Sequence, residues 1–377
     1  MSEQRKRILE LVEKGTISAQ EALALLEALD KEKATEEEKE KDIFNELVAD
    51  VHEEKKNEEK SEKTSSHQKQ KDKLMDFMQS ALNKIKNLDF DFQINHSVEV
   101  SHVFQQSDVL LKEVSVDVAN GKVELHPWDQ NEVRIECKAK VYRTEDEEVA
   151  RRNFLANTTF SIENGALRYG TELKWMKVDT KIYIPQQQYE KMYVRIFNGG
   201  IKANKLETET LKLKTANGRI DVNGLKSKKA EIDTSNGAIK LLDVVSEKVE
   251  VESINGKILV EGDIHYSDLQ SLNGNVVFTL TGEKADTIHT KAVTGNIDLY
   301  VPEHMTIEGE AKSNLGSFKM AMKGIEVIEE KNEVVQKHIR FSKQGDLVDK
   351  LHIFADTKTG SVLIKKYEPT NDTNDEA

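Results

Sequence analysis

The chain has 377 residues, with 68 Asp or Glu against 55 Lys or Arg, and its formal net charge at pH 7 is −13. Phosphate is bound by clustered Lys and Arg, so this balance argues against nucleic acid as the main partner. No apolar run approaches the roughly 20 residues of a membrane-spanning helix, and the N-terminus lacks the apolar core of a secretory signal. We therefore expect a cytoplasmic protein that is at most peripheral to the membrane.

Residues 1–30 are predicted to form a helical hairpin. The first helix ends at Gly15, which tolerates the left-handed conformation of a helix C-cap, and the second begins with a capping box of Ser18 and Glu21. A hairpin this short buries too little surface to be stable alone, so we expect it to dock on a partner, to self-associate or to pack on the rest of the chain. The apolar side chains available for such contacts are Leu23, Leu26 and Leu29.

Residues 31–73 carry 14 acidic and 11 basic side chains and few apolar ones. Such a segment cannot bury enough apolar surface to offset the entropy of ordering it. We interpret it as a flexible charged linker, with one short helix predicted at 42–52. The last ten residues, 368–377, are predicted to be an acidic disordered tail.

Residues 74–88 are predicted to form an amphipathic helix, with Lys73, Lys84 and Lys86 near the border of its polar face. Three interpretations stay open: the helix caps the open end of the β body, lies in a membrane interface, or mediates self-association. Its apolar stripe consists of Leu74, Phe77, Met78, Ala81, Leu82, Ile85 and Leu88.

Residues 89–367 show alternating apolar and polar positions and a repeated Gly-x-φ-x-φ pattern, in which φ is apolar. An Asn precedes the glycine in seven of the ten repeats, and Asn and Gly are the residues that most readily form tight corners. The glycines are Gly121, Gly165, Gly199, Gly218, Gly237, Gly256, Gly274, Gly295, Gly316 and Gly360.

The intervals between these glycines, from Gly199 to Gly316, are 19, 19, 19, 18, 21 and 21 residues. A near-constant period favours a mainly β fold in which each repeat is one coil of a single-stranded β-solenoid, stacked about 4.8 Å from the next. The alternative is an antiparallel meander with an Asn-Gly hairpin turn in each repeat. A helix is predicted at 145–157, where it would protect the edge of the sheet.

No nucleophile motif, nucleotide-binding loop or metal-ligand spacing is found in the sequence, so we expect no enzyme activity, cofactor or metal site. Cys137 alternates with apolar residues and should be buried and inert. Trp128 follows a strand, where it would either touch a ligand or pack on the rim of the body.

The solenoid interpretation also predicts a charged surface on neighbouring coils, where Lys212 and Lys214 pair with the next rung. The following rungs stack like charges, which is unfavourable unless solvent, a cation or a basic partner compensates. A solvated face is the simplest expectation. The acidic candidates for an interaction surface are Glu231, Asp233, Glu250 and Glu252.

Two segments resemble known families. Residues 8–26 are similar to the SHOCT-like helical hairpin, a presumed interaction or oligomerisation module of bacterial proteins. The segment 120–133 and the Ile182-Tyr183-Ile184-Pro185 strand, with the Asn-Gly coils that follow, resemble a bacterial domain of unknown function named for candidate adhesins. The whole arrangement is similar to YvlB- and LiaX-type envelope-stress proteins.

This resemblance implies a non-enzymatic scaffold of the cell-envelope stress response that binds protein partners, among them phage-shock-type membrane proteins. A surface-exposed adhesin or peptide-binding protein is an alternative. A β-helix carbohydrate-active enzyme is a weaker alternative. Such enzymes place two catalytic carboxylates in one groove, whereas the carboxylates of this sequence are spread over many coils.

Overall fold

The computed structural model describes residues 96–172, 175–332 and 336–368. The predicted hairpin, linker and amphipathic helix therefore lie outside the described residues, as do Leu23, Leu26, Leu29, Phe77, Met78 and nearly all of the tail. The described residues form one helix, α4, and 21 strands joined in a single sheet. Among them, no helix is long and apolar enough to cross a membrane.

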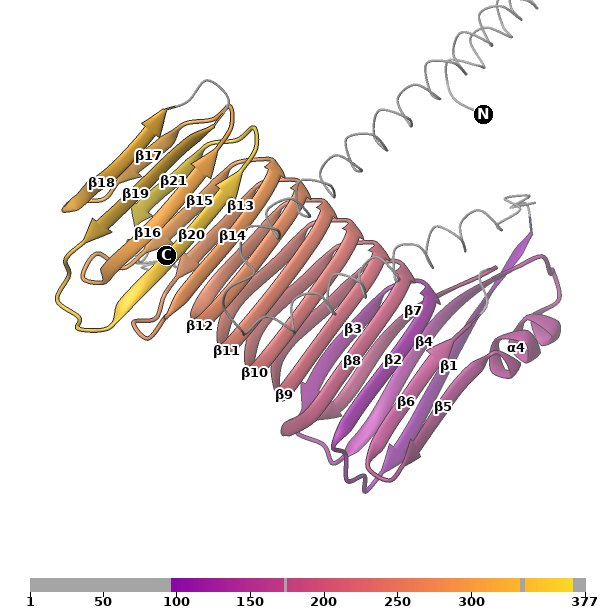
Figure 1. Cartoon of the computed structure of the whole chain (residues 1–377). Coiled ribbons are helices and arrows are strands. Elements are labelled where there is room, and N and C mark those ends of the chain that lie inside the picture. The colour runs from indigo at the N-terminus through magenta and orange to yellow at the C-terminus, as the bar shows by residue number, and fades with distance from the viewer. Residues whose placement is uncertain (1–95, 173–174, 333–335, 369–377) are drawn as a thin grey trace, which may run out of the picture. The chain divides into compact units, whose positions relative to one another are not determined.

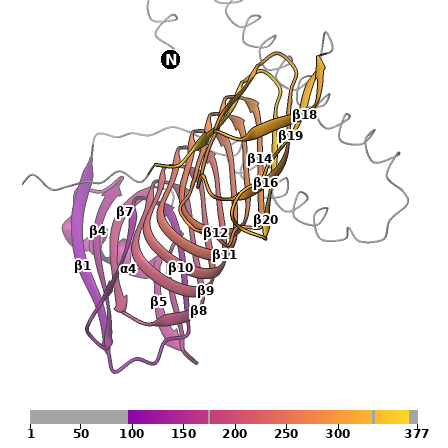
Figure 2. The same ribbon diagram turned by 90° about the vertical axis from the view of Figure 1, so that its left-hand side faces the viewer.

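The centre of the body is a stack of four long parallel strands, β9 (Ile201–Asn217), β10 (Ile220–Asn236), β11 (Ile239–Asn255) and β12 (Ile258–Asn273). Asn217, Asn236 and Asn255 pair in register with one another, and Asn255 pairs with Asn273. Each coil is one continuous curved strand rather than the two short strands that the sequence suggests (Figures 1 and 2). Parallel pairing confirms the solenoid and contradicts the meander at these coils.

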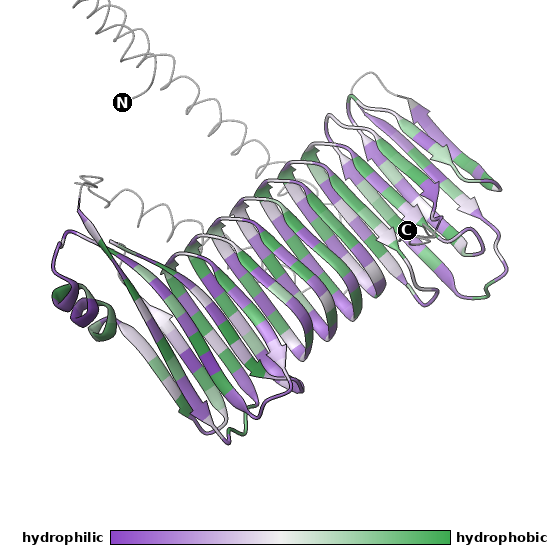
Figure 3. Cartoon of the chain, turned by 180° about the vertical axis from the view of Figure 1, so that it is seen from behind, coloured by the Kyte–Doolittle hydropathy of each residue, from purple (hydrophilic) through white to green (hydrophobic). Residues whose placement is uncertain are grey.

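Every coil has two sides, separated by a second corner in mid-strand. Lys205, Gly224 and Asp243 stand at equivalent places in three successive coils, and all three have positive φ. We call the part that follows an Asn-Gly corner the post-corner side and the part that leads into the next corner the pre-corner side. Inward residues of both sides form one continuous hydrophobic core, which gives the alternating bands of Figure 3.

The N-terminal end adds strands to both sides. On the post-corner side, β3 pairs with β9, and β7, β4 and β1 then pair in this order toward the N-terminal end. On the pre-corner side, β8 pairs with β9, and β2, β6 and β5 then pair in this order. The bounds are β1 (Ser97–Ser107), β2 (Glu113–Asn120), β3 (Val123–Trp128), β4 (Glu132–Tyr142), β5 (Thr158–Glu163), β6 (Ala166–Thr171), β7 (Met176–Pro185) and β8 (Gln188–Asn198).

The predicted helix is present as α4 (Glu147–Ala156). It begins at Asp146, whose carboxylate accepts a hydrogen bond from the backbone N–H of Val149 at 3.0 Å. Its buried residues, Ala150 and Phe154, pack where β1, β4 and β5 meet, so the helix covers this end of the body (Figure 1).

At the C-terminal end the coils stack in an order that differs from the chain order. The coil formed by β20 and β21 lies between the coil of β14 and β15 and that of β16 and β17. Beyond them β16, β19 and β18 pair antiparallel. The bounds are β13 (Val276–Leu280), β14 (Thr287–Thr294), β15 (Ile297–Val301), β16 (Thr306–Ser313), β17 (Phe318–Ala321), β18 (Ile325–Asn332), β19 (Lys337–Lys343), β20 (Lys350–Thr357) and β21 (Val362–Lys366).

Nine of the ten repeat glycines form one column of stacked corners, which we call the glycine column. A Cβ atom added at Gly218, for example, would lie 1.9 Å from the carbonyl oxygen of Gly199 in the coil below. Glycine is therefore required by backbone contact between coils. The tenth, Gly165, instead follows Asn164 in a hairpin turn between β5 and β6, where both have positive φ.

Side chains beside the glycine column complete its hydrogen bonding. Asn217 donates from Nδ2 to Oδ1 of Asn198 at 2.8 Å, and Asn236 donates to Asn217 at 2.9 Å, so the corner amides form a ladder. The hydroxyl of Thr215 donates to the carbonyl of Gly199 at 2.9 Å, and Thr234 does the same to Gly218 at 3.2 Å. These bonds explain why a small hydroxyl residue precedes each corner.

Replacing Gly218 by Ala should destabilise the body by about 3 kcal/mol or more, because neither backbone in the contact can retreat without breaking its neighbours. Chemical denaturation would measure the loss. Gly200→Ala is the matched control, since its added Cβ would meet the carbonyl oxygen of Arg219 only at 3.1 Å. Equal effects of the two substitutions would contradict the importance of the column contact.

Candidate interaction surfaces

Four predicted acidic residues come together on the pre-corner side. The register places Lys212, Glu231 and Glu250 in one row that continues to Asp268. A second row, one pleat closer to the corner, contains Lys214, Asp233, Glu252 and Gln270. We call these two lines the charged rows.

Opposite charges in the charged rows pair between coils. The ammonium group of Lys214 contacts both Asp233 and Glu231, and it lies 3.1 Å from Oε1 of the latter. Two lysines outside the rows also approach Glu250 to 2.8 Å, Lys229 from the preceding coil and Lys248 from the same strand. Asp233 and Lys214 are only 4% and 7% exposed, so the expectation of a solvated face is wrong at the centre of this surface.

The electrostatic environment of the charged rows differs sharply from one residue to the next. Burial alone would lower the pKa of Lys214, but the carboxylates of Asp233 and Glu231 outweigh it and raise this pKa above the ordinary value. Glu252 forms no hydrogen bond or ion pair through its carboxylate within the described part of the chain. Burial raises its pKa to about 7, and the neighbouring carboxylates of Asp233 and Asp268 add to the effect.

Glu252→Gln should stabilise the protein by about 1 to 2 kcal/mol at pH 8, because it removes an unpaired carboxylate from a partly buried site. The pKa of Glu252 is higher in the folded state than the ordinary 4.5, so the wild type loses stability as pH rises from 4.5 through about 7. The advantage of the variant should therefore vanish near pH 4.5, as thermal unfolding across this range would reveal.

Glu250→Gln is the control for this prediction. Burial opposes ionisation of Glu250, but its hydrogen bonds with Lys229 and Lys248 prevail and lower its pKa. The control should lose stability at pH 8. A Glu252→Gln variant that is no more stable than the wild type at pH 8 would contradict the unpaired state of this carboxylate.

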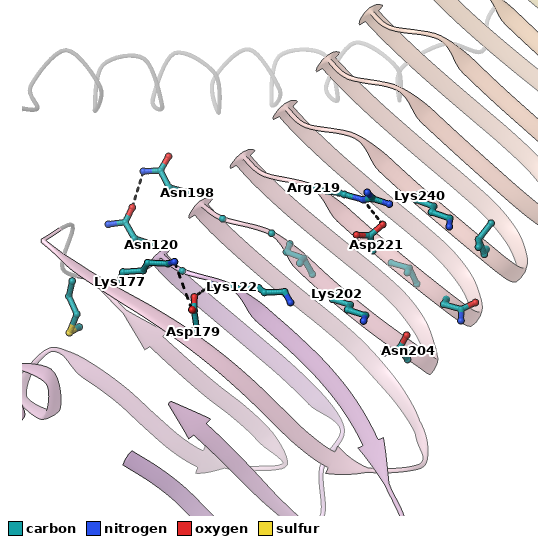
Figure 4. Close-up of a pocket in the computed structure, with 18 of the residues that line it drawn as sticks. Asn120, Lys122, Lys177, Asp179, Asn198, Lys202, Asn204, Arg219, Asp221 and Lys240 are labelled. Atoms are coloured by element: carbon teal, nitrogen blue, oxygen red, sulfur yellow. Dashed lines mark hydrogen bonds and ion pairs between the residues drawn. The ribbon is translucent and has the colours of Figure 1, made fainter. Parts of the chain in front are cut away.

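A pocket of about 1140 Å³ lies on the post-corner side, along the strands β3, β7, β9, β10 and β11 (Figure 4). We call it the corner pocket, because Gly121 and Gly199 of the glycine column form part of its lining. Five basic and two acidic side chains line it, which makes it basic on an acidic protein. The charged lining residues are Lys122, Lys177, Lys202, Arg219, Lys240, Asp179 and Asp221.

Both acidic groups of the corner pocket already have partners. Oδ1 of Asp221 lies 2.7 Å from Nε of Arg219, and Oδ1 of Asp179 accepts a hydrogen bond from the backbone N–H of Lys122 at 3.1 Å (Figure 4). Lys202 and Lys240, in contrast, form no ion pair with any described residue. The lining of the pocket therefore carries more positive than negative charge, although Asp221 lies between Lys202 and Lys240 in register.

Trp128 lies away from the charged rows. Its ring lies 5.1 Å from that of Tyr183, which stacks on His126 at 5.3 Å, and its Nε1 donates to the carbonyl oxygen of Glu132 at 2.9 Å. This half-buried arrangement favours the rim-packing interpretation. Cys137 is buried, which confirms the prediction of its position, and burial raises its pKa to about 11, which favours the unreactive thiol over the thiolate.

Sequence reasoning grouped the acidic residues of the charged rows but missed the corner pocket. The sequence does contain a pattern that indicates this pocket. Lys202, Asp221 and Lys240 each stand three residues after a corner glycine, at the same outward position of three successive coils. Within residues 96–172, 175–332 and 336–368, no group of three His, Cys, Asp or Glu side chains could hold a metal ion.

The stacked coils define a β-solenoid. Residues 105–349 match the model of the Toastrack DUF4097 family, and the chain belongs to this family. Residues 3–34 match a SHOCT-like domain, which confirms the resemblance of the N-terminal segment. YvlB of Bacillus subtilis (strain 168) is 41% identical over 365 residues, which are 97% of this chain and 99% of that protein.

Solved structures with low sequence identity also match. A candidate adhesin from Parabacteroides merdae is 13% identical, with a TM-score of 0.35, over 71% of this chain and 96% of that one. A candidate adhesin from Bacteroides fragilis is 12% identical, with a TM-score of 0.35, over 72% of this chain and 97% of that one.

Proposed function

We propose that this protein is a non-enzymatic interaction scaffold of the bacterial cell-envelope stress response. In this proposal the solenoid supplies a rigid binding surface, and the SHOCT-like hairpin docks on a partner or oligomerises. The protein works in the cytoplasm, peripheral to the membrane, where phage-shock-type membrane proteins are candidate partners. The family assignment supports the interpretation as an interaction protein. The single structural observation on which the proposal rests is the corner pocket.

The corner pocket suits an acidic segment of a protein partner. Lys202 and Lys240 extend from strands two rungs apart, and parallel neighbours in a sheet are about 4.8 Å apart, so the two positions are separated by roughly 10 Å. Because the strands fix the backbone at both positions, the protein loses mainly side-chain entropy when carboxylates bind to both. An extended acidic peptide that runs along the coils can present carboxylates at this spacing.

The double charge reversal Lys202→Glu and Lys240→Glu should abolish binding of an acidic peptide, while leaving the fold intact. Titration of the full chain with poly-L-glutamate measures this binding. Repeating the titration at several salt concentrations tests whether the affinity is electrostatic. The matched control is Lys226→Glu with Lys323→Glu, two exposed lysines outside the pocket. Equal binding by both variants would show that the corner pocket is not the site.

The cellular part of the proposal needs a separate readout. In a strain that lacks the native gene, the wild type and the control variant should restore growth under cell-wall stress, whereas the pocket variant should not. Protease treatment of intact cells should leave the protein undigested. Digestion would instead support the surface-exposed adhesin or peptide-binding alternative.

A further inference from the structure

Eight asparagines in the sequence are followed directly by glycine. Glycine has no side chain to hinder its backbone nitrogen, so this nitrogen can attack the side-chain amide of the preceding asparagine more easily than that of any other residue. The fold places the eight pairs in three different settings. Six lie in the glycine column, at Asn120, Asn198, Asn217, Asn236, Asn255 and Asn273, one lies at the second corner of β10, at Asn223, and one lies in the turn between β5 and β6, at Asn164.

The glycine column holds both groups that would react. At the corner of Asn217, the backbone N–H of Gly218 donates to the carbonyl oxygen of Asn236 at 2.8 Å, and the side-chain amide of Asn217 belongs to the ladder of corner amides. Attack at such a corner must therefore break hydrogen bonds of the nucleophile and of the amide together. The same backbone hydrogen bond to the next coil is formed by Gly121, Gly199, Gly237, Gly256 and Gly274.

The pair at the second corner is shielded in another way. The side chain of Asn223 is exposed, but Gly224 is buried within β10, between β9 and β11. An added Cβ at Gly224 would already meet the backbone of Lys205 at 3.3 Å. Water that must take the proton from the attacking nitrogen is therefore kept away from Gly224.

Asn164 lies in the one pair without such protection. The turn consists of Asn164 and Gly165 with φ of 52° and 79°, and Glu163 pairs with Ala166 across it. Asn164 is exposed, and within the part of the chain that the structure describes neither its side-chain amide nor the N–H of Gly165 forms a hydrogen bond. Among the described strands β5 pairs with β6 alone, at the N-terminal end of the body (Figure 1), so this hairpin can open locally.

We propose that Asn164 is the site at which this protein converts spontaneously to aspartate and isoaspartate. The backbone nitrogen of Gly165 gives its proton to water and forms a bond to Cγ of Asn164. The bond from Cγ to Nδ2 then breaks, and Nδ2 takes up a proton and leaves as ammonia. Water opens the resulting five-membered imide at either carbonyl, so one water is consumed and one ammonia is released for each aspartate or isoaspartate formed.

The conversion changes the turn and its contacts. Both products add one negative charge, and isoaspartate also adds one carbon atom to the backbone of a two-residue turn. The carbonyl oxygen of Gly165 accepts hydrogen bonds from the N–H groups of Lys112 at 2.7 Å and Glu113 at 3.1 Å. A lengthened turn should therefore loosen both the β5–β6 hairpin and the start of β2.

Peptide mapping by mass spectrometry tests the proposal on the full chain, incubated at mildly alkaline pH and sampled over time. Conversion at Asn164 should be at least about tenfold faster than at each of the other seven asparagines. A tenfold ratio of rates corresponds to about 1.4 kcal/mol, which is comparable to the net contribution of one hydrogen bond. Conversion at a corner of the glycine column that is as fast as at Asn164 would overturn the proposal.

The same incubation in concentrated urea separates the effect of the fold from that of the local sequence. In the unfolded chain all eight asparagines should convert at similar rates, because each is followed by glycine and none is held by a neighbouring coil. If Asn164 stayed about tenfold faster than the others in urea, the selectivity would belong to the residues around it, and the assigned protection by the glycine column would be wrong.

Two variants connect the chemistry to the charge of the intact protein. Asn164→Gly keeps a residue that tolerates positive φ and removes the amide, so the more acidic species seen by anion-exchange chromatography should form about tenfold more slowly. Asn217→Gly is the matched control in the glycine column and should form this species at no less than the wild-type rate. An undiminished acidic species in Asn164→Gly would show that another residue is the main site.

Discussion

The close approach of backbones in the glycine column is the constraint on which the rest of the structure depends. In eight successive contacts, an added Cβ would lie 1.5 to 2.2 Å from the carbonyl oxygen of the neighbouring corner. The corners must therefore stay in line, and differences in coil length must be absorbed elsewhere. The 18-residue step from Gly256 to Gly274 is absorbed at the second corner, where the register between β11 and β12 shifts after Leu241. In the longer steps the coil divides into separate strands, such as β13 and β14.

A fixed column also determines what the surfaces can do. Because equivalent side chains stack about 4.8 Å apart, a single charged position becomes a row, and neighbouring like charges repel unless a counter-charge lies between them. Lys214 supplies that counter-charge for Asp233 and Glu231, whereas Glu252 is left among carboxylates. On the post-corner side, Asp221 lies between Lys202 and Lys240, so these two lysines are not direct neighbours. The interior repeats, while the outward residues vary from coil to coil, so the differences between coils are found on the surface.

The sequence was sufficient to predict local structure but not the order of stacking. Period-two alternation and Asn-Gly corners predicted the coils, the buried Cys137 and the helix at the edge, because these depend on residues close in the chain. Gly165 carries the same motif and yet forms a hairpin turn, and the Gly360 corner lies between those of Gly295 and Gly316. Which corners stack depends on contacts between distant segments. The burial of Lys214 and Asp233 was missed for the same reason, since strand alternation assigns both to the outside.

The two ends of the body carry features that protect exposed strand edges. A stack of parallel coils exposes strand edges, which would otherwise pair with another copy. At one end α4 covers the space between β1, β4 and β5. At the other, β19 and β18 pair antiparallel, and β18 carries a register shift between Val327 and Glu329 together with several charged side chains. Antiparallel pairing, a bulge and charge each disfavour addition of a parallel coil. The charged rows and the corner pocket lie on the sides of this solenoid rather than at its ends.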